Sequence, residues 1–327
     1  MKKLFSIIVP CYNSASYLMR CYHSIVQQTI GMDKLQVIFI DDASKDETFD
    51  MLCRLEKEYP DSIMVIRLEE NVRQGAARNI ALQYAVGEYI SFVDSDDSVS
   101  LNMYERLENI ITEYSPDIIK FSHDVVAGEG IVLREERQQY KEGLYTLDSI
   151  EDRRKMLMSE MLDYGCWNKV YKTEYVLNTG VSFAEQLIYE EPKFTYPLYF
   201  YIKSFYLVDE ILYHYTFNVN GTMQKEMRTA GKLYDHILVQ AQTYEFVKDT
   251  LDKKVLADYE KEIEAYFVKS FFCETILFAE WGKLLLEETI LEQMKEWMMT
   301  YFPNYKENPY IAQLFSEQHK AALSKME

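Results

Sequence analysis

Glycine is scarce in this chain of 327 residues, which contains 11 glycines and none before Gly31. A dinucleotide-binding fold and a P-loop both place a glycine-rich turn directly after the first strand, where backbone amides approach a phosphate. Because no glycine occurs at that place, the sequence supports neither kind of phosphate-binding loop.

Cysteine pairs and basic stripes are lacking as well. The formal net charge is -18, and the densest basic cluster is only Arg153-Arg154-Lys155. Binding a nucleic acid needs a basic stripe, so we expect no nucleic-acid partner. The cysteines number five and form no C-x-x-C pair, which is typical of free thiols in a reducing compartment and predicts a cytoplasmic protein.

Long apolar runs are also absent, since no stretch approaches the ~18 residues that a membrane span needs. The first apolar run resembles the start of a signal peptide, but Pro10, Tyr12 and Asn13 interrupt it and no small-residue cleavage site follows. An apolar content of 48% is ample for a packed interior, so we expect a soluble, globular protein.

Four apolar runs rich in β-branched and aromatic residues occupy the first third of the chain and predict buried parallel strands. They are residues 4–9, 35–40, 63–68 and 89–93. The stretches between them predict helices at 15–28, 46–59 and 74–86. Ser44 or Asp46 is the expected N-cap of the second helix, and Gly87 is expected to close the third. This alternation indicates a doubly wound, mainly parallel α/β sheet flanked by helices.

The pattern is more mixed after Leu101. We expect a helix at about 103–114, a strand at 117–122 and hairpin segments up to about 144. From about Tyr234 the chain is almost wholly helical with wide apolar faces, and the best linker candidate runs from Gly221 to Gly231. Such faces are most often core. They leave open a peripheral contact with the inner face of the cell membrane, although the basic face usual for that role is lacking.

Three carboxylates in Asp94-Ser-Asp-Asp97 follow directly on the fourth predicted strand. Side chains alternate along a strand, so Asp94 and Asp96 are expected to point the same way. Two such acids beside an anionic ligand repel each other and the ligand unless a hard divalent cation lies between them. The alternative is a simple strand-end turn, in which Asp and Ser are common.

Polar motifs also follow the other predicted strands, and the carboxyl ends of such strands line one crevice in a doubly wound sheet. One carboxylate of Asp41-Asp42 can accept a hydrogen bond from a ligand N–H, or cap the next helix instead. Arg78, in a helix that opens near Gly75, can bind phosphate, or can be an ordinary surface arginine.

Glu190-Glu191 lies in an apolar and aromatic segment, where burial raises a carboxylate's pKa toward values useful for a proton acceptor. A helix N-terminus with Pro192 in its first turn is the alternative, and both interpretations can hold together. The segments Trp167-Asn-Lys169 and Tyr213-His-Tyr215 add aromatic rings and basic groups suited to sugar and phosphate contacts. Among the histidines, His214 is the candidate contact to a metal or phosphate.

In order and spacing, these motifs resemble those of a family 2 glycosyltransferase with the GT-A fold. The motifs are Ser6-Ile-Ile-Val-Pro-Cys-Tyr-Asn13, Val37-Ile-Phe-Ile-Asp-Asp-Ala-Ser44, Gly75-Ala-Ala-Arg-Asn79, Asp94-Ser-Asp-Asp97 and Tyr189-Glu-Glu191. The resemblance implies a GT-A domain over residues 1–223, with a donor half at about 1–100 and an acceptor half at about 101–223. The helical C-terminal region, 224–327, carries no matching motif.

The resemblance implies transfer of a sugar, with inversion, from a nucleotide-diphosphate sugar to a hydroxyl group. The donor is usually a UDP-sugar, and the acceptor is a saccharide or lipid-linked saccharide in surface polysaccharide or glycan synthesis. Carried over by position, Pro10 and Tyr12 border the base, Asp42 accepts the uracil N–H, and Arg78 lies near the nucleotide.

The resemblance further implies that Asp94 contacts ribose and metal, that Asp96 holds Mn²⁺ or Mg²⁺ on the diphosphate, and that Glu191 is the general base. Two positions depart from the family pattern. Glu191 stands where the family has Asp, which moves the carboxylate outward by about one C–C bond. Thr216 stands where many relatives carry an arginine, which questions a phosphate contact.

Two other interpretations remain open. A sugar nucleotidyltransferase also needs a metal-binding Asp on an α/β sheet, but it should have a Gly-rich, basic loop after the first strand. A non-catalytic nucleotide-sugar-binding protein would tolerate loss of the base, yet Glu190-Glu191 is present. The identity of the sugar and acceptor, and whether the chain forms a homodimer, are not determined by the sequence.

Overall fold

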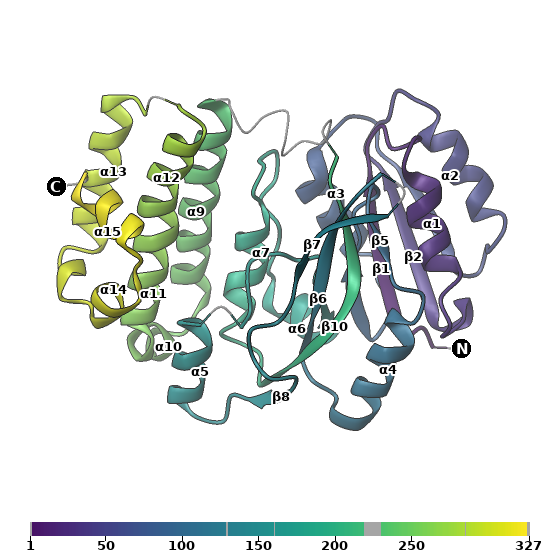
Figure 1. Cartoon of the computed structure of the whole chain (residues 1–327), viewed down its shortest axis with the longest axis horizontal. Coiled ribbons are helices and arrows are strands. Elements are labelled where there is room, and N and C mark those ends of the chain that lie inside the picture. Colours follow the sequence, from purple (N-terminus) through teal and green to yellow (C-terminus); the bar gives the residue numbers. More distant parts are fainter. Residues whose placement is uncertain (1, 129, 160, 219–229, 285, 326–327) are drawn as a thin grey trace.

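The computed structural model describes the chain except for residues 1, 129, 160, 219–229, 285 and 326–327 (Figure 1). One sheet of 10 strands has the order β3-β2-β1-β4-β9-β6-β10-β5, and in addition β7 pairs with β6 and β8 with β10. The strands are β1 Phe5–Cys11, β2 Leu35–Asp41, β3 Ile63–Arg67, β4 Tyr89–Phe92, β5 Ser98–Val99, β6 Ile118–Ala127, β7 Ile131–Glu136, β8 Gly143–Thr146, β9 Lys169–Lys172 and β10 Ser204–Thr216.

The sheet is mainly parallel, as expected. Strand β1 pairs in parallel with β2 and β4, β2 with β3, and β6 with β10. Strand β9 is antiparallel to both β4 and β6, so these two neighbours still run in the same direction. The three strands whose carboxyl ends carry the sequence motifs, β2, β1 and β4, are therefore adjacent.

Helices cover both faces of the sheet (Figure 1). Those in the first two thirds of the chain are α1 Leu18–Val26, α2 Thr48–Glu56, α3 Arg73–Leu82, α4 Met103–Tyr114, α5 Ile150–Leu157, α6 Thr173–Thr179 and α7 Glu191–Leu198, with the short 3-10 helix η1 Met32–Lys34. Because side chains alternate along a strand, Ile7 packs with α1, α2 and α4, whereas Ile8 packs with α3 and α7.

The C-terminal region is helical, as predicted. It contains α9 Ala230–Thr250, α10 Lys253–Asp258, α11 Glu260–Phe267, the π-helix η2 Val268–Cys273, α12 Glu274–Trp281, α13 Glu288–Tyr301, η3 Tyr305–Glu307, α14 Pro309–Leu314 and α15 Glu317–Ser324. Its apolar faces are largely core: Phe267 and Phe271 are buried in the same cluster as Phe194 of α7. The predicted linker and the boundary at 223 lie outside the described residues, apart from Ala230 and Gly231, which open α9.

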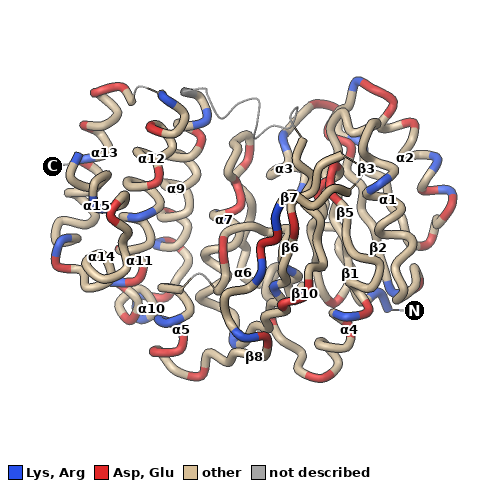
Figure 2. Tube along the Cα trace, viewed as in Figure 1, with Lys and Arg blue, Asp and Glu red and all other residues tan. Residues whose placement is uncertain are grey.

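Neither the distribution of charged residues nor the helices of the described chain indicate a basic stripe or a membrane span. Figure 2 shows acidic residues distributed from one end of the molecule to the other and no continuous basic stripe along the described trace. None of the helices in the described part of the chain combines the length and apolar character needed to cross a membrane.

Two predicted helix caps are wrong. Helix α2 starts at Thr48 with Glu47 at its N-cap, while Asp46 accepts the Thr48 N–H at 3.0 Å from outside the helix. Helix α3 ends at Leu82, well before Gly87. The role of Gly87 is instead steric, because a Cβ there would lie 2.4 Å from the backbone nitrogen of Ser6 in β1.

Candidate active site

Polar side chains gather at the carboxyl ends of β1, β2 and β4, which is where a doubly wound sheet forms its ligand crevice. The loops around it contain non-glycine residues with positive φ, namely Asn13 at 51°, Ala43 at 57° and Arg73 at 64°. The segment before α7 adds Gln186 at 61° and Tyr189 at 62°. Such backbone strain is costly and is found preferentially at functional sites, so it marks the loops that follow these strands.

The three aspartates after β4 divide into two roles. Asp97 is buried, accepting hydrogen bonds from the Tyr213 hydroxyl at 2.6 Å and from the Thr216 backbone N–H at 2.7 Å. Asp94 and Asp96 are only partly buried. Asp97 therefore anchors the loop to β10, which leaves Asp94 and Asp96 as the carboxylates available to a ligand.

The predicted base-binding residues lie around the ends of β1 and β2. Pro10 is buried within β1, and the Tyr12 ring is 46% exposed at the start of the following loop. Asp42 is buried and its Oδ1 accepts the Val72 backbone N–H at 2.7 Å, which fixes the chain just before α3. Asp42 thus has a structural contact, and its role toward a base stays a prediction.

Arg78 connects the donor-side carboxylates with the acid pair. Its side chain is 1% exposed and donates from Nη2 to Asp94 Oδ1 at 2.7 Å and from Nη1 to Glu190 Oε1. Gln74 also donates to Glu190 Oε1, at 2.8 Å. Both guanidinium ends are thus occupied by carboxylates, so we interpret Arg78 as a positioning residue, and the predicted nucleotide contact remains untested.

Gly75 lets the segment before α7 lie directly against α3. A Cβ at this position would be 2.2 Å from the Ala184 carbonyl oxygen and 3.0 Å from Cγ of Glu190. No side chain fits at that distance from backbone, so glycine is required by the close approach. The Gly75-Ala-Ala-Arg-Asn79 motif therefore brings the acid pair beside α3.

The helix start that the sequence offered as the alternative is present: Glu191 opens α7, with Glu190 at the N-cap and Pro192 in the first turn. Its Oε1 accepts the Cys166 backbone N–H at 2.7 Å. Burial, followed by the charge of Glu190, raises the pKa of Glu191 to about 7, although Arg78 and the Cys166 N–H oppose the shift. The side chain is only partly buried, so a carboxylate with the pKa of a good base remains accessible.

Sequence reasoning missed Arg20. From α1, its Nη2 donates to Thr216 Oγ1 at 2.7 Å and to the Asp96 backbone carbonyl. A guanidinium thus lies beside Thr216, where the family resemblance led us to expect an arginine and the sequence has none. Arg20 and Thr216 are 196 residues apart in the sequence, so only the packing of α1 against β5 and β10 could reveal that they are neighbours.

Two other basic groups serve the structure. His214 has both ring nitrogens engaged, Nδ1 with Asp124 at 2.8 Å and Nε2 with Ser100 at 3.0 Å, so in this arrangement neither is directed to a metal or phosphate. Lys169 is fully buried and its Nζ lies 2.6 Å from Asp163 Oδ1. The Trp167 and Tyr213 ring centroids lie 4.8 Å apart next to the Asp97 anchor, but Tyr213 is fully buried, so the sugar contact of these aromatic rings stays a prediction.

Asp94 and Asp96 fit a divalent cation by their chemistry. Burial and the charge of Asp94 raise the pKa of Asp96, and a cation between the two acids would offset both effects. In the described residues, no group of three or more His, Cys, Asp or Glu side chains is arranged to hold a metal. A Mg²⁺ or Mn²⁺ ion at a phosphate site needs only one or two carboxylates, because the ligand's phosphates and water complete its shell.

We expect Arg78→Met to lower the free energy of unfolding by about 3 kcal/mol, because it leaves the buried Glu190 carboxylate and the half-buried Asp94 without the cation that neutralises them. Urea unfolding measures this. Arg106→Met is the matched control, since Arg106 also pairs with two carboxylates, Glu142 and Glu210, but near the surface. Arg106→Met should lower the free energy of unfolding by less than about 1 kcal/mol. Equal costs for the two variants would contradict the bridging role.

The structure is an α/β fold with acidic side chains at the carboxyl ends of adjacent parallel strands. The sequence profile of "Glycosyl transferase family 2" matches residues 6–177, which is more than half of the chain. The chain therefore belongs to glycosyl transferase family 2.

Relatives of this chain include two Bacillus proteins whose names refer to teichoic acid and to poly(ribitol-phosphate). The minor teichoic acid biosynthesis protein GgaB of Bacillus subtilis is 28% identical over 265 residues, which are 80% of this chain and 28% of GgaB. Poly(ribitol-phosphate) beta-glucosyltransferase of Bacillus spizizenii is 27% identical over 217 residues, 66% of this chain and 32% of that protein. The chain thus spans about a third of the length of the relatives it matches.

Solved structures show the same fold. Staphylococcus aureus TarS 1–349 in complex with UDP-GlcNAc superposes with a TM-score of 0.59 at 18% identity, covering 96% of this chain and 93% of that chain. The mannosyltransferase PcManGT of Pyrobaculum calidifontis, in complex with GDP-Man and Mn²⁺, gives 0.52 at 16% identity, covering 100% and 87%. The GT-A fold with a helical C-terminal region is therefore confirmed.

Proposed function

We propose that this protein is a metal-dependent, inverting glycosyltransferase that moves a sugar from a nucleotide-diphosphate sugar, specifically a UDP-sugar, to an acceptor hydroxyl. The observation that carries the proposal is the Asp94–Arg78–Glu190 bridge, which joins the donor-side carboxylates to the segment of Glu191. TarS solved with UDP-GlcNAc, and relatives named for teichoic acid synthesis, support a UDP-sugar donor and a role in surface polysaccharide synthesis.

In this proposal the donor binds over the ends of β1, β2 and β4. The exposed ring of Tyr12 contacts the base, and Asp42 accepts its N–H through the oxygen that does not bond Val72. Asp94 and Asp96 would hold the divalent cation, which when bound would stabilise the charge of the leaving diphosphate. Arg20, beside Asp96, adds positive charge at the same end of the crevice.

Glu191 acts on the acceptor side. The Cys166 N–H holds its Oε1, so Oε2 can take the proton of the attacking hydroxyl while that oxygen bonds to the anomeric carbon. A single base suffices for direct displacement, which gives inversion. Glu190, paired with Arg78 and Gln74, holds the first turn of α7 in place and takes no proton.

The other candidate functions are a non-catalytic nucleotide-sugar-binding protein and a sugar nucleotidyltransferase. The accessible Glu191 carboxylate favours catalysis over binding alone. A panel of UDP-, GDP- and dTDP-sugars, assayed for hydrolysis with Mn²⁺ and with EDTA, tests the proposal. Metal-dependent release of UDP is the expected result, and release of a nucleoside monophosphate, or binding without turnover, would contradict it.

We expect Asp42→Ala to weaken UDP binding about 10- to 100-fold, because a buried acceptor would lose its match to the uracil N–H. Calorimetry should show that inorganic diphosphate binds to the variant as it does to the unchanged protein. Equal weakening of both ligands would instead assign Asp42 to holding the Val72 N–H and the loop before α3.

A further inference from the structure

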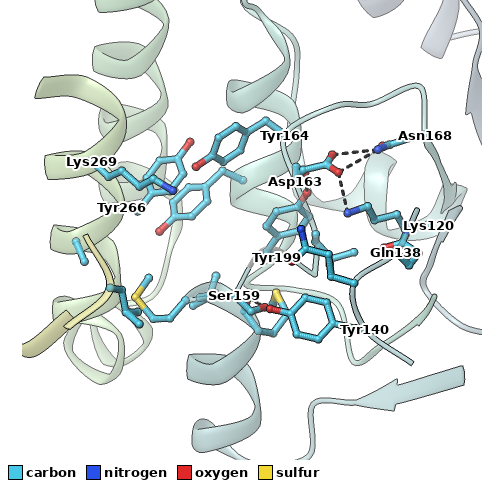
Figure 3. Close-up of a pocket in the computed structure, with 18 of the residues that line it drawn as sticks. Lys120, Gln138, Tyr140, Ser159, Asp163, Tyr164, Asn168, Tyr199, Tyr266 and Lys269 are labelled. Carbon is cyan, nitrogen blue, oxygen red and sulfur yellow. Dashed lines mark hydrogen bonds and ion pairs between the residues drawn. The ribbon is translucent and has the colours of Figure 1, made fainter. Parts of the chain in front are cut away.

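A cavity of about 540 Å³ lies between the acceptor half and the C-terminal helices (Figure 3). Its lining comes from β6, β7, α5, α7, α11, η2, α12 and α14 and from the loops that precede β8 and β9. A volume of this size is in the range of small-molecule sites. None of the residues assigned above to the donor or to the base lines it.

Tyrosine dominates the wall of this cavity. Tyr196 of α7 and Tyr266 of α11 stack with ring centroids 3.5 Å apart, and Tyr140, Tyr164 and Tyr199 also line the space (Figure 3). The Tyr196 hydroxyl is buried and has no hydrogen-bond partner in the described part of the chain. Flat rings suit the apolar face of a sugar, and a buried phenol without a partner indicates that a polar group is missing from this wall.

The charges of the lining cancel. Three cations, Lys120, Arg137 and Lys269, are matched by three acids, Glu136, Asp163 and Glu274. Lys120 Nζ lies 2.7 Å from Asp163 Oδ2, an ion pair drawn in Figure 3. Burial lowers the pKa of His123, so this ring adds no charge at neutral pH. A neutral, hydroxyl-rich ligand therefore fits the cavity better than a phosphate.

One segment separates the cavity from the crevice. Asp163, Tyr164 and Asn168 line the cavity, whereas the N–H of Cys166, between them in sequence, holds Glu191. The Trp167 ring lies 4.6 Å from the ring of cavity-lining His123, with the Tyr213 ring on the crevice side. The wall between the cavity and the proposed base is thus a few residues thick.

We propose that this cavity is a saccharide-binding site, which holds a neutral sugar or polyol unit of the acceptor at a distance from the hydroxyl that reacts. The inference rests on the proposed glycosyl transfer, and it specifies the acceptor as a chain of more than one unit. An acceptor chain that runs from this unit around the segment 163–168 would bring its reacting hydroxyl to Glu191, and the remote unit supplies binding energy that the reacting group alone does not have.

The test uses the full chain on an array of neutral and of phosphate- or uronate-bearing oligosaccharides, with calorimetry of UDP in the same preparations. Gln138 lines the cavity from a partly exposed position, so Gln138→Trp fills the space and Gln138→Ala, the matched control, leaves it open. Leu314→Trp, at a 54% exposed lining position on α14, is a second filling variant with little risk to folding.

We expect the unchanged protein and Gln138→Ala to bind neutral glycans, and both tryptophan variants to bind them at least about 10-fold more weakly with unchanged UDP affinity. Equal glycan binding by the tryptophan and alanine variants, binding of anionic glycans alone, or no glycan binding by a protein that binds UDP would overturn the inference. Failure of UDP binding and donor hydrolysis would refute the proposed function instead, and would leave glycan binding by the cavity as a separate result.

Discussion

Glu191→Gln should slow sugar transfer by about 10²- to 10⁴-fold while leaving UDP affinity unchanged. Glutamine keeps the shape of the side chain and an oxygen that can accept the Cys166 N–H, but it cannot take a proton at neutral pH. The loss therefore appears in the rate of transfer and leaves donor binding intact. Transfer assays under saturating donor, with calorimetry of UDP, measure both quantities.

The pH dependence of sugar transfer tests the role of Glu191 independently. The base is active as the carboxylate, and the pKa of Glu191 is raised to about 7, so kcat/KM for the acceptor should fall about tenfold per pH unit below 7. The residual activity of Glu191→Gln should not show this fall in kcat/KM below pH 7, which we call the acidic limb of the pH profile. Glu190→Gln serves as the neighbouring control and should retain both the limb and most of the rate.

Two outcomes would refute this assignment. One is a Glu191→Gln enzyme with a near-normal rate of transfer. The other is a product whose anomeric configuration, measured from NMR coupling constants, matches that of the donor, because direct displacement with one base requires inversion.

Asp96→Asn should lower turnover by about 10³-fold or more, since losing several kcal/mol of charge stabilisation on the leaving diphosphate raises the barrier by that factor. It should also remove the effect of Mn²⁺ on UDP affinity, which calorimetry with Mn²⁺ and with EDTA measures without any turnover. Burial and the nearby Asp94 charge raise the pKa of Asp96, so a cation at this place is favoured over two bare carboxylates.

Asp97→Asn separates a metal role from a structural one. Asp97 is anchored by Tyr213 and the Thr216 N–H, so its variant should lose stability while UDP binding in the folded fraction keeps its dependence on Mn²⁺. If UDP binds the unchanged protein equally well with EDTA and with Mn²⁺, the proposed cation site is wrong.

The sequence by itself determined the α/β class, the order of the elements in the first third of the chain and the edge of the sheet where the proposed site lies. Each apolar run and each helical pattern is local, and the carboxyl ends of parallel strands meet at one edge whatever the loops do. Predicted strands at 4–9 and 35–40 correspond to β1 Phe5–Cys11 and β2 Leu35–Asp41. The motifs at these strand ends could therefore be placed around one crevice without coordinates.

Only the tertiary structure decided how the polar groups pair. Arg78 bonds Glu190 across 112 residues, Arg20 bonds Thr216 across 196, and Gly75 meets the Ala184 carbonyl. Local periodicity holds no information about such partners, because they depend on how α1, α3 and α7 pack on the sheet. The cavity walled by Tyr196 and Tyr266 has the same origin: its two sides belong to helices that come together only when the C-terminal region packs on α7.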